Sequence, residues 1–435
     1  MNDRNTWTMV WRYLVLLLKV IFLIVSLLII YGLAINFTNG YGQGIAAASI
    51  MLLLQATVIC VLWKRKRRPF LLTYVLIAST ILFYIFVVYT IVPVASGRKI
   101  TTVTDFTNVK TQYWKLKTGS SIAYYKLEAA MGVPKKTCPI IFLHGGPGAY
   151  VRQLDINFFS MFTREGYDVY LYDQAGSGRS LLLRKEEYSH KRNVQDFEAI
   201  LEKIGSEKYI AIGMSYGATL LASASTEKEI SNKLYKIVYA EPGIVIKPTH
   251  DPIMPRSPSA GKDDVSMPLR LFIGILLNPR GYFTSQNEVI NYFSEHKNLI
   301  QGLLRDAYPL RDSAMIPAVD VNIINFSLNG IIAPEVNKYN EKLTAEFKLH
   351  HIPSMLMMGE SSYIDRNGPL DLLKEDPNIV RVQYFKGTGH LLWNGLYHNN
   401  DDVEKSILEF LSDEVPSLPN YPLTKDILEF ARNRK

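Results

Sequence analysis

Cysteine is scarce in this sequence, and familiar metal-binding patterns are absent. The 435 residues include only two cysteines, Cys60 and Cys138. So few thiols exclude a disulfide framework and a zinc site built from cysteines. The eight histidines show no H-E-x-x-H or similar spacing. We therefore expect no metal site.

Acidic residues are almost missing from the first 99 positions. This part carries ten Lys or Arg and a single acid, Asp3, whereas the remaining 336 residues carry 38 basic and 39 acidic side chains. The net charge of +8 thus comes entirely from the amino-terminal part, where it lies beside apolar sequence. Such a distribution indicates membrane topology and argues against a nucleic-acid partner.

Three long apolar runs occupy this basic part of the chain, at residues 13–35, 44–63 and 70–95. Each has about 20 residues or more, which is enough for a helix to cross a hydrocarbon core of about 30 Å. A cleaved signal peptide has a single, shorter apolar region. Residues 1–99 are therefore predicted to form a membrane anchor of three transmembrane helices.

The loops between the runs predict the orientation of the anchor. Five consecutive basic residues, 64–68, separate the second and third runs, whereas the first connection, 36–43, carries no charge. Positive loops stay in the cytoplasm, so the amino terminus is expected inside the cell. Arg98 and Lys99 oppose this weakly. The protein is thus expected to be an integral protein of the cell membrane with residues beyond 100 outside the cytoplasm.

Beyond residue 100, short apolar strands alternate with helical stretches. Two of the expected strands, 111–117 and 121–128, flank a turn and predict an antiparallel hairpin. Runs rich in Ile, Val, Met and Tyr follow at 139–143, 168–172, 208–212, 235–240, 354–358 and 381–385. Apolar strands joined by helices are typical of a parallel sheet covered on both faces.

The alternation is interrupted between residues 248 and 349. This segment begins with a loop rich in Pro, Ser and Gly and continues as amphipathic helical sequence. An insertion of this length usually forms a lid or cap over a site. The expected α/β core thus comprises residues 100–247 and 350–435, with a helical cap at 248–349.

Two glycine-rich turns follow strands of this core. Residues 213–217 read G-x-S-x-G between a strand and a helix, a context that places Ser215 on a strained, exposed turn as a nucleophile. Residues 144–148 read H-G-G-P-G, and glycines after a strand let backbone N–H groups approach a substrate closely. We expect an oxyanion hole made by the N–H groups of Gly146 and Tyr216. A phosphate loop is disfavoured, because neither G-x-G-x-x-G nor Lys-Ser/Thr is present there.

His390 follows the last core strand on a glycine-flanked loop, within residues 387–390. It also precedes the last helical stretch, at 402–411. This placement suits a general base that must reach a nucleophile on another strand. We therefore pair His390 with Ser215.

Together these features resemble the α/β-hydrolase superfamily, and within it the proline iminopeptidase-like serine aminopeptidases. The resemblance rests on H-G-G-P-G at 144–148, on D-Q-x-G-x-G-x-S at 173–180, on the G-x-S-x-G turn and on the helical cap. It covers about residues 105–415 and leaves out the membrane anchor. It departs at Ala218, where these peptidases usually have a second glycine. The resemblance implies an α/β-hydrolase fold, short peptides with a free amino terminus as substrates, and no cofactor.

The acid of the triad is the least certain part of this resemblance. The family places it three residues after the glycine that ends the penultimate strand, here Gly359, and that position is Ser362. Asp365, on the same loop, is the favoured candidate. Glu360 on that loop and Glu241, at the end of an earlier core strand, remain alternatives.

The resulting hypothesis is a membrane-anchored serine hydrolase of aminopeptidase type. Ser215 would attack the carbonyl, His390 would transfer the proton, and Asp365 would fix the imidazole tautomer. Partners would be a peptide or small acyl substrate and the lipid bilayer. One alternative is an esterase or lipid acyl hydrolase, because the fold hosts many chemistries. The other is an interaction protein with a degenerate triad.

The predicted topology can be tested by cysteine labelling. In a chain with Cys60 and Cys138 replaced by serine, Gly40→Cys should react with a membrane-impermeant maleimide on intact cells. Lys66→Cys should react only after permeabilisation, because the basic loop is expected in the cytoplasm. The opposite labelling pattern would place the domain beyond residue 100 in the cytoplasm.

Overall fold

The computed structural model describes residues 106, 108–243, 271, 325, 327–340, 343–359, 362, 364, 367–385, 388–393 and 399–419, with a few isolated positions before residue 90. Contacts divide the chain into two units, residues 1–95 with 266–288 and residues 96–265 with 289–435. The sheet and the candidate site lie in the second unit.

The predicted membrane anchor lies almost wholly outside the described residues. Among those that are described, no helix combines the length and apolar character needed to cross a bilayer. The spans at 13–35, 44–63 and 70–95 therefore stay a prediction. Most of the expected cap, 248–349, likewise lies outside the described residues, which resume at Asn325.

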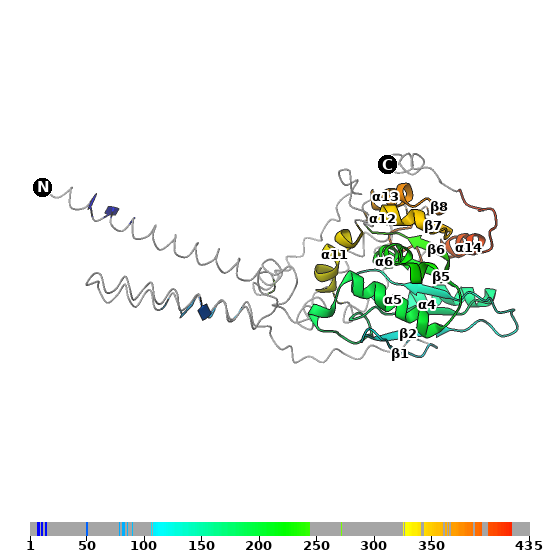
Figure 1. Cartoon of the computed structure of the whole chain (residues 1–435), viewed down its shortest axis with the longest axis horizontal. Helices are drawn as coiled ribbons and strands as arrows, with labels where there is room; N and C mark the ends of the chain where they lie inside the picture. Colours follow the sequence, from blue (N-terminus) through cyan, green and yellow to red (C-terminus); the bar gives the residue numbers. More distant parts are fainter. Residues whose placement is uncertain are drawn as a thin grey trace. The chain divides into compact units, whose positions relative to one another are not determined.

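The described core contains a single eight-stranded sheet (Figure 1). Its order is β1-β2-β4-β3-β5-β6-β7-β8. The strands are β1 (Gln112–Lys115), β2 (Ser121–Leu127), β3 (Ile140–Leu143), β4 (Val169–Tyr172), β5 (Tyr209–Met214), β6 (Leu234–Ala240), β7 (Ser354–Gly359) and β8 (Ile379–Phe385). β2 pairs antiparallel with β1 and β4, and all the remaining pairs are parallel. The predicted hairpin and mostly parallel sheet are confirmed.

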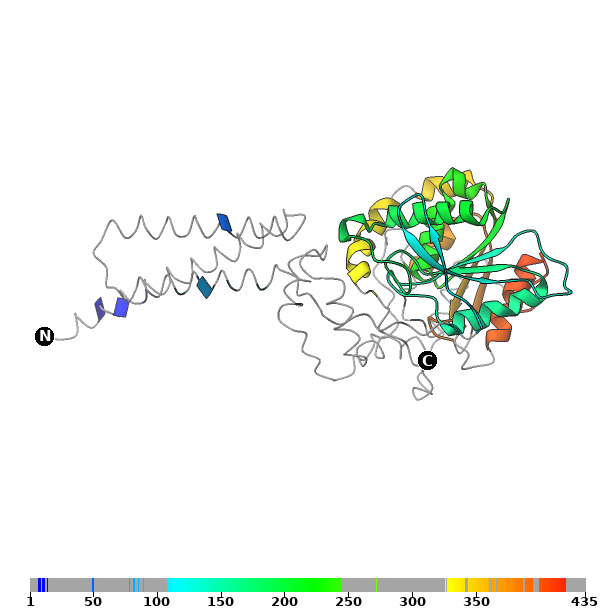
Figure 2. The ribbon, with the colours of Figure 1, turned by 90° about the horizontal axis from the view of Figure 1, so that it is seen from below.

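Alternate residues of the central strands supply two apolar layers. In β5, Tyr209 and Ala211 face one layer, and Ile210 and Ile212 face the other. A strand buried on both faces needs apolar residues at consecutive positions, which explains its unbroken apolar sequence. Figure 2 shows helices on both sides of the sheet.

Different helices cover the two faces. The first layer packs against α5 (His190–Ile204), α6 (Tyr216–Ser225), α11 (Ser327–Tyr339), α12 (Leu343–Glu346) and α13 (Asn367–Glu375). The second packs against α4 (Gln153–Ser160) and α14 (Asn399–Leu411). The short helix α7 (Lys228–Ser231) and three 3₁₀ turns, Met161–Glu165, Lys185–Glu187 and Phe347–Leu349, complete the described elements.

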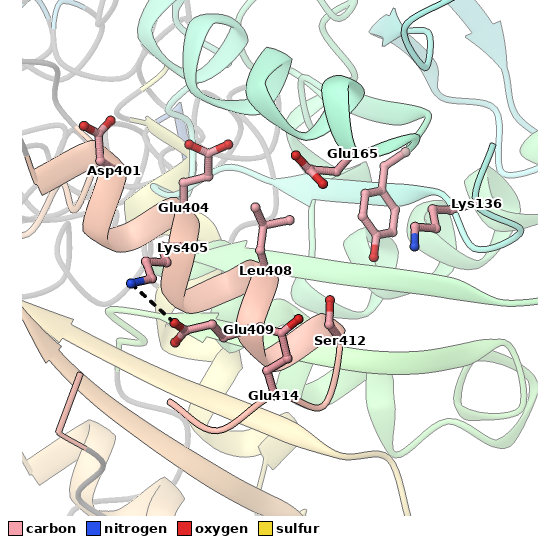
Figure 3. Close-up of a pocket in the computed structure, with 10 residues that line it drawn as sticks. Lys136, Glu165, Asp401, Glu404, Lys405, Leu408, Glu409, Ser412 and Glu414 are labelled. Atoms are coloured by element: carbon pink, nitrogen blue, oxygen red, sulfur yellow. Dashed lines mark ion pairs between the residues drawn. The ribbon is translucent and has the colours of Figure 1, made fainter. Parts of the chain in front are cut away.

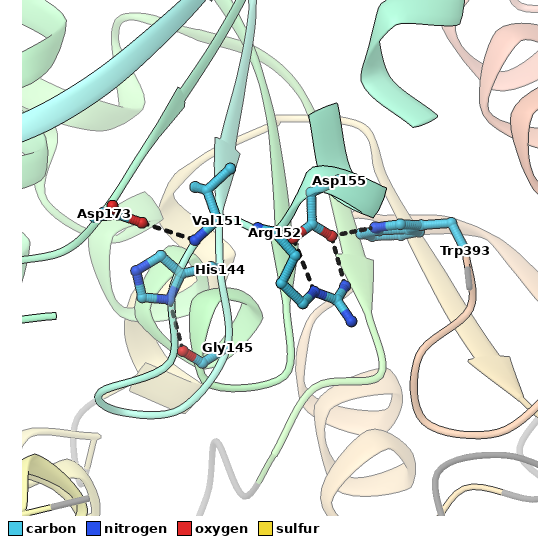
Figure 4. Close-up of polar contacts among 7 residues, drawn as sticks. All are labelled: His144, Gly145, Val151, Arg152, Asp155, Asp173 and Trp393. Atoms are coloured by element: carbon cyan, nitrogen blue, oxygen red, sulfur yellow. Dashed lines mark hydrogen bonds and ion pairs between the residues drawn. The ribbon is translucent and has the colours of Figure 1, made fainter. Parts of the chain in front are cut away.

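The buried carboxylate of Asp155 connects α4 to the chain after β8 (Figure 4). The Asp155 carboxylate accepts hydrogen bonds from the Arg152 guanidinium, at 2.5 and 2.9 Å, and from Trp393 Nε1, at 2.8 Å. Trp393 is fully buried and stacks on Phe158 with ring centroids 4.8 Å apart. Because Trp393 lies three residues after His390, these contacts fix the loop that carries the predicted base.

Removing this carboxylate should destabilise the domain. Asp155→Ala leaves the Trp393 N–H buried without its acceptor and removes the carboxylate that pairs with Arg152. We expect the free energy of unfolding to fall by about 3–5 kcal/mol. Asp402→Ala, an exposed position on α14, should change it by less than about 0.5 kcal/mol. Equal denaturation midpoints for the two variants would contradict the assigned role of Asp155.

Candidate active site

Ser215 occupies the strained turn that its sequence context predicts. It lies between the end of β5 and the start of α6, with φ 55° and ψ −121°. Such a left-handed conformation is costly for a residue with a side chain and persists only where the surroundings hold it. Its N–H donates to the carbonyl of Ala240, at the end of β6, over 2.9 Å.

The glycines of the turn are required by backbone crowding. A Cβ on Gly213 would lie 2.5 Å from the carbonyl oxygen of Gly217. A Cβ on Gly217 would lie 2.1 Å from the carbonyl oxygen of Leu143, at the end of β3. No side-chain rearrangement relieves contacts with backbone atoms. The turn therefore closes tightly and packs directly on the neighbouring strand.

The H-G-G-P-G loop lies against Ser215. A Cβ on Gly145 would approach the Ser215 Cβ to 2.9 Å, and Gly146 has φ 122°, which favours glycine. Tyr216 is the first residue of α6, where backbone N–H groups have no partner within the helix. The structure thus places the loop that contains Gly146, and residue Tyr216, beside Ser215, while the oxyanion role of both stays a prediction.

The Tyr216 side chain points into the core. Its hydroxyl accepts a hydrogen bond from Asn193 Nδ2, at 2.9 Å, and lies 3.0 Å from His190 Nδ1. Both partners belong to α5, and burial lowers the pKa of His190 to about 4. His190 is therefore neutral near pH 7, and its contact anchors the first turn of α6.

The His144 side chain stabilises the H-G-G-P-G loop, of which it is the first residue, by two hydrogen bonds to backbone groups (Figure 4). Its Nε2 accepts from the N–H of Gln174 at 2.9 Å, and its Nδ1 lies 2.7 Å from the carbonyl of Gly145, to which it donates. The Gln174 side-chain amide donates to the carbonyl of His144 at 2.7 Å. Burial lowers the pKa of His144, so the neutral tautomer needed for this pattern is the stable one.

Asp173 organises the D-Q-x-G-x-G-x-S segment. Its carboxylate accepts from the N–H of Val151 at 2.7 Å, the N–H of Arg179 at 2.9 Å and the hydroxyl of Tyr125 at 2.7 Å. Burial raises the pKa of this carboxyl group. The three donors join β2, the chain before α4 and the loop after β4. The buried hydrogen bonds of Asp173 and Gln174 thus connect the segments on which the site is built.

Asn325 joins the chain before α11 to the two motif loops. The N–H of Asn325 donates to the carbonyl of Gly148 at 2.9 Å, and its side-chain amide donates to the carbonyl of Gly176 at 2.8 Å. Asn325 is fully buried. Its two bonds connect the chain before α11 to both motif loops, a role that the sequence pattern did not indicate.

A carboxylate contacts His390, and it belongs to Glu241. His390 Nδ1 lies 3.3 Å from Glu241 Oε2, and both side chains are buried. Glu241 follows β6 directly and has φ 50°. The favoured acid, Asp365, and the alternative Glu360 lie outside the described residues. Among the described carboxylates, Glu241 is the one hydrogen-bonded to this imidazole.

Donors from β7 and its loop hold the Glu241 carboxylate. The N–H of Gly359 donates to Oε1, and the hydroxyl of Ser362 donates to Oε2. Ser362, at the position where the resemblance places the triad acid, is therefore a hydrogen-bond partner of Glu241. Within the described residues, no group of three His, Cys, Asp or Glu side chains is placed to hold a metal ion.

A separate surface pocket of about 370 Å³ lies beside α14 (Figure 3). Its lining includes Glu165, Asp401 and Glu404 together with Lys136 and Lys405. Neither Ser215 nor His390 borders it. It is therefore distinct from the site described above.

Comparison with known proteins agrees with this architecture. Residues 139–392 match the family described as alpha/beta hydrolase fold. The proline iminopeptidase of Thermoplasma volcanium is 22% identical over 302 residues, which cover 67% of this chain and 94% of that protein. The proline iminopeptidase of Neisseria meningitidis is 38% identical over 93 residues, which cover 21% of this chain and 29% of that protein.

Solved structures include both peptidases and esterases. An esterase from Exiguobacterium antarcticum has 12% identity and a TM-score of 0.48, covering 70% of this chain and 100% of that chain. The proline iminopeptidase of Mycobacterium smegmatis has 16% identity and a TM-score of 0.45, covering 70% of this chain and 98% of that chain.

Gly359→Ala should disturb the histidine loop. The new methyl group would lie 2.3 Å from the carbonyl oxygen of Gly389 and 2.9 Å from that of Thr388, so the loop that carries His390 must move. We expect a loss of about 1–3 kcal/mol in the free energy of unfolding and slower reaction of Ser215 with a fluorophosphonate probe.

Gly132→Ala is the control, because a Cβ at Gly132 meets nothing within 4 Å, although the positive φ of Gly132 adds backbone strain of its own. It should leave the labelling rate unchanged. Equal labelling of the two variants would show that the contact of Gly359 with the histidine loop does not matter for the site.

Proposed function

The chain belongs to the alpha/beta hydrolase fold family, and on this premise we propose that it is a serine hydrolase with Ser215 as nucleophile, His390 as general base and Glu241 as the orienting acid. The observation that carries the proposal is the buried contact between Glu241 and His390. Ser215, Glu241 and His390 follow the parallel strands β5, β6 and β8 of one sheet. Ligands of open α/β sheets bind at the carboxyl ends of the strands.

The proposed chemistry follows from this arrangement. An Nδ1–H donated to Glu241 leaves Nε2 of His390 as the nitrogen that takes the proton of Ser215. Ser215 attacks the carbonyl carbon of the substrate, and the N–H groups of Gly146 and Tyr216 stabilise the oxyanion. The protonated imidazole then protonates the leaving group. Water, activated by the same imidazole, releases the acyl group from Ser215.

Glu241 is preferred to Asp365 because its carboxylate already has the contacts of a triad acid. It is buried, receives donors from Gly359 and Ser362, and lies against Nδ1 of His390. A triad requires one carboxylate at that nitrogen. Asp365 and Glu360 remain the alternatives against which Glu241 is tested.

The substrate class proposed is short peptides with a free amino terminus, hydrolysed after their first residue. The motifs at 144–148 and 173–180 support this, as does the similarity to proteins named proline iminopeptidase. An esterase is the second candidate, because the same acyl-transfer chemistry cleaves esters. We also propose that residues 1–99 anchor the enzyme in the cell membrane with the hydrolase outside the cytoplasm, on the strength of the three apolar runs and the basic loop.

The experiment compares substrates on the full chain in detergent. Prolyl and other aminoacyl 4-nitroanilides should be hydrolysed faster than 4-nitrophenyl esters of fatty acids, and Ser215→Ala should abolish both hydrolysis and fluorophosphonate labelling. Faster ester hydrolysis would favour the esterase. Undiminished labelling of Ser215→Ala would remove Ser215 from its proposed role.

The acid is assigned by isosteric variants in the same assay. Glu241→Gln should lower kcat by orders of magnitude, with about 10⁴-fold as the reference for loss of the orienting carboxylate. Asp365→Asn and Glu360→Gln should each leave kcat within a few-fold of the parent. A large loss in Asp365→Asn with near-normal Glu241→Gln would return the role to Asp365.

A further inference from the structure

We propose that Ser362 is a positioning residue of the active site, which holds the Glu241 carboxylate against His390. It also lies so close to His390 that an aspartate at position 362 would take over the role of Glu241. This inference deepens the proposed function and rests on it. Its basis is the side-chain geometry around Ser362, which is buried at the edge of the site.

The direction of the Ser362 hydroxyl is fixed by its neighbours. Its Oγ accepts a hydrogen bond from the N–H of Ile364, at 3.2 Å, and donates to Glu241 Oε2. A hydroxyl has a single proton to donate. That proton goes to Glu241, so Ser362 Oγ, 3.4 Å from Nδ1 of His390, can meet the Nδ1–H only as an acceptor. The charged carboxylate of Glu241, at 3.3 Å, is the stronger acceptor for that proton.

The Glu241 side chain depends on such donors for its position. Glutamate has a long, flexible side chain, and burying its charge is costly unless hydrogen bonds replace water. Oε1 is held by the N–H of Gly359, whereas Oε2 receives both Ser362 and His390. Without the hydroxyl, Oε2 would keep His390 alone, and the carboxylate could rotate away from it.

Ser362 and Glu241 also approach the same nitrogen from comparable distances. His390 Nδ1 is 3.3 Å from Glu241 Oε2 and 3.4 Å from Ser362 Oγ. In an aspartate at position 362, the carboxyl carbon takes the place of Oγ and its oxygens extend about one bond further, within hydrogen-bond reach of Nδ1. With Glu241 still present, two carboxylates would share the pocket and repel each other.

Substitutions of Ser362 should change kcat differently in the parent chain and in the Glu241→Gln variant. Ser362→Ala should lower kcat about tenfold with little change in KM, since a hydrogen bond to a charged group stabilises the orienting carboxylate, and Ser362→Thr should restore most of the loss. Ser362→Asp should impair the parent enzyme, yet raise the kcat of Glu241→Gln at least tenfold when the two changes are combined.

The assay is aminoacyl 4-nitroanilide hydrolysis by the full chain in detergent, with thermal unfolding measured for every variant. Ser354→Ala is the matched control, since Ser354 is buried at the opposite end of β7, and it should retain parental kcat. Ser362→Asp is expected to lower kcat in the parent chain and to raise it in the Glu241→Gln variant. This change of sign is a readout that a purely structural residue would not give.

Parental kcat in Ser362→Ala would overturn the positioning role. A double variant that unfolds at the temperature of Glu241→Gln but is no more active than it would overturn the exchange. If the double variant is unstable, the comparison of Ser362→Ala with Ser362→Thr decides alone. Hydrolysis or fluorophosphonate labelling that persists in Ser215→Ala would instead overturn the proposed function on which the inference rests.

Discussion

Backbone packs directly against backbone at the carboxyl ends of the parallel strands, and the rest of the site depends on this closeness. Gly217 lies on the carbonyl of Leu143, and Gly359 lies on the carbonyl of Gly389. Each contact brings together the chain ends of two different strands without any side chain between them. Ser215 and Glu241 both have a positive φ, and the closely packed neighbouring backbone holds them in this strained conformation.

Beneath this layer, buried polar groups give the loops their rigidity. His144 is kept neutral by burial and uses both ring nitrogens on backbone groups, while Asp173 gathers donors from three segments. A neutral imidazole fixed in this way is poorly suited to carry protons, although it opens a motif whose loop lies against Ser215. Sequence patterns therefore identify loops more surely than they identify which side chain on a loop performs the chemistry.

The sheet, its hairpin and the strand–turn–helix around Ser215 were predictable because each depends on local sequence: unbroken apolar strands, and glycines at fixed offsets. The contact between Glu241 and His390 was not, because it joins residues 149 positions apart through the pairing of β6, β7 and β8. One signal was available: Glu241, like Ser215 and His390, comes just after a core strand. Counting positions along the loop after β7 led to Ser362, and Asp365 was favoured as the aspartate on that loop, because a count along one loop takes no account of side chains on a neighbouring strand. Asp365 lies outside the described residues.

Glu241 lies just before the segment that is expected to be inserted in the core, and this position has a consequence for changes in that segment. The continuously described chain stops at Gly243, two residues after Glu241, and Asn325, before α11, is hydrogen-bonded to the loop that holds Gly146. Both junctions of the insertion therefore belong to the site. A variant in which this segment is replaced by that of a relative would therefore have a different chain attached beside Glu241 at one end and beside the loop that holds Gly146 at the other.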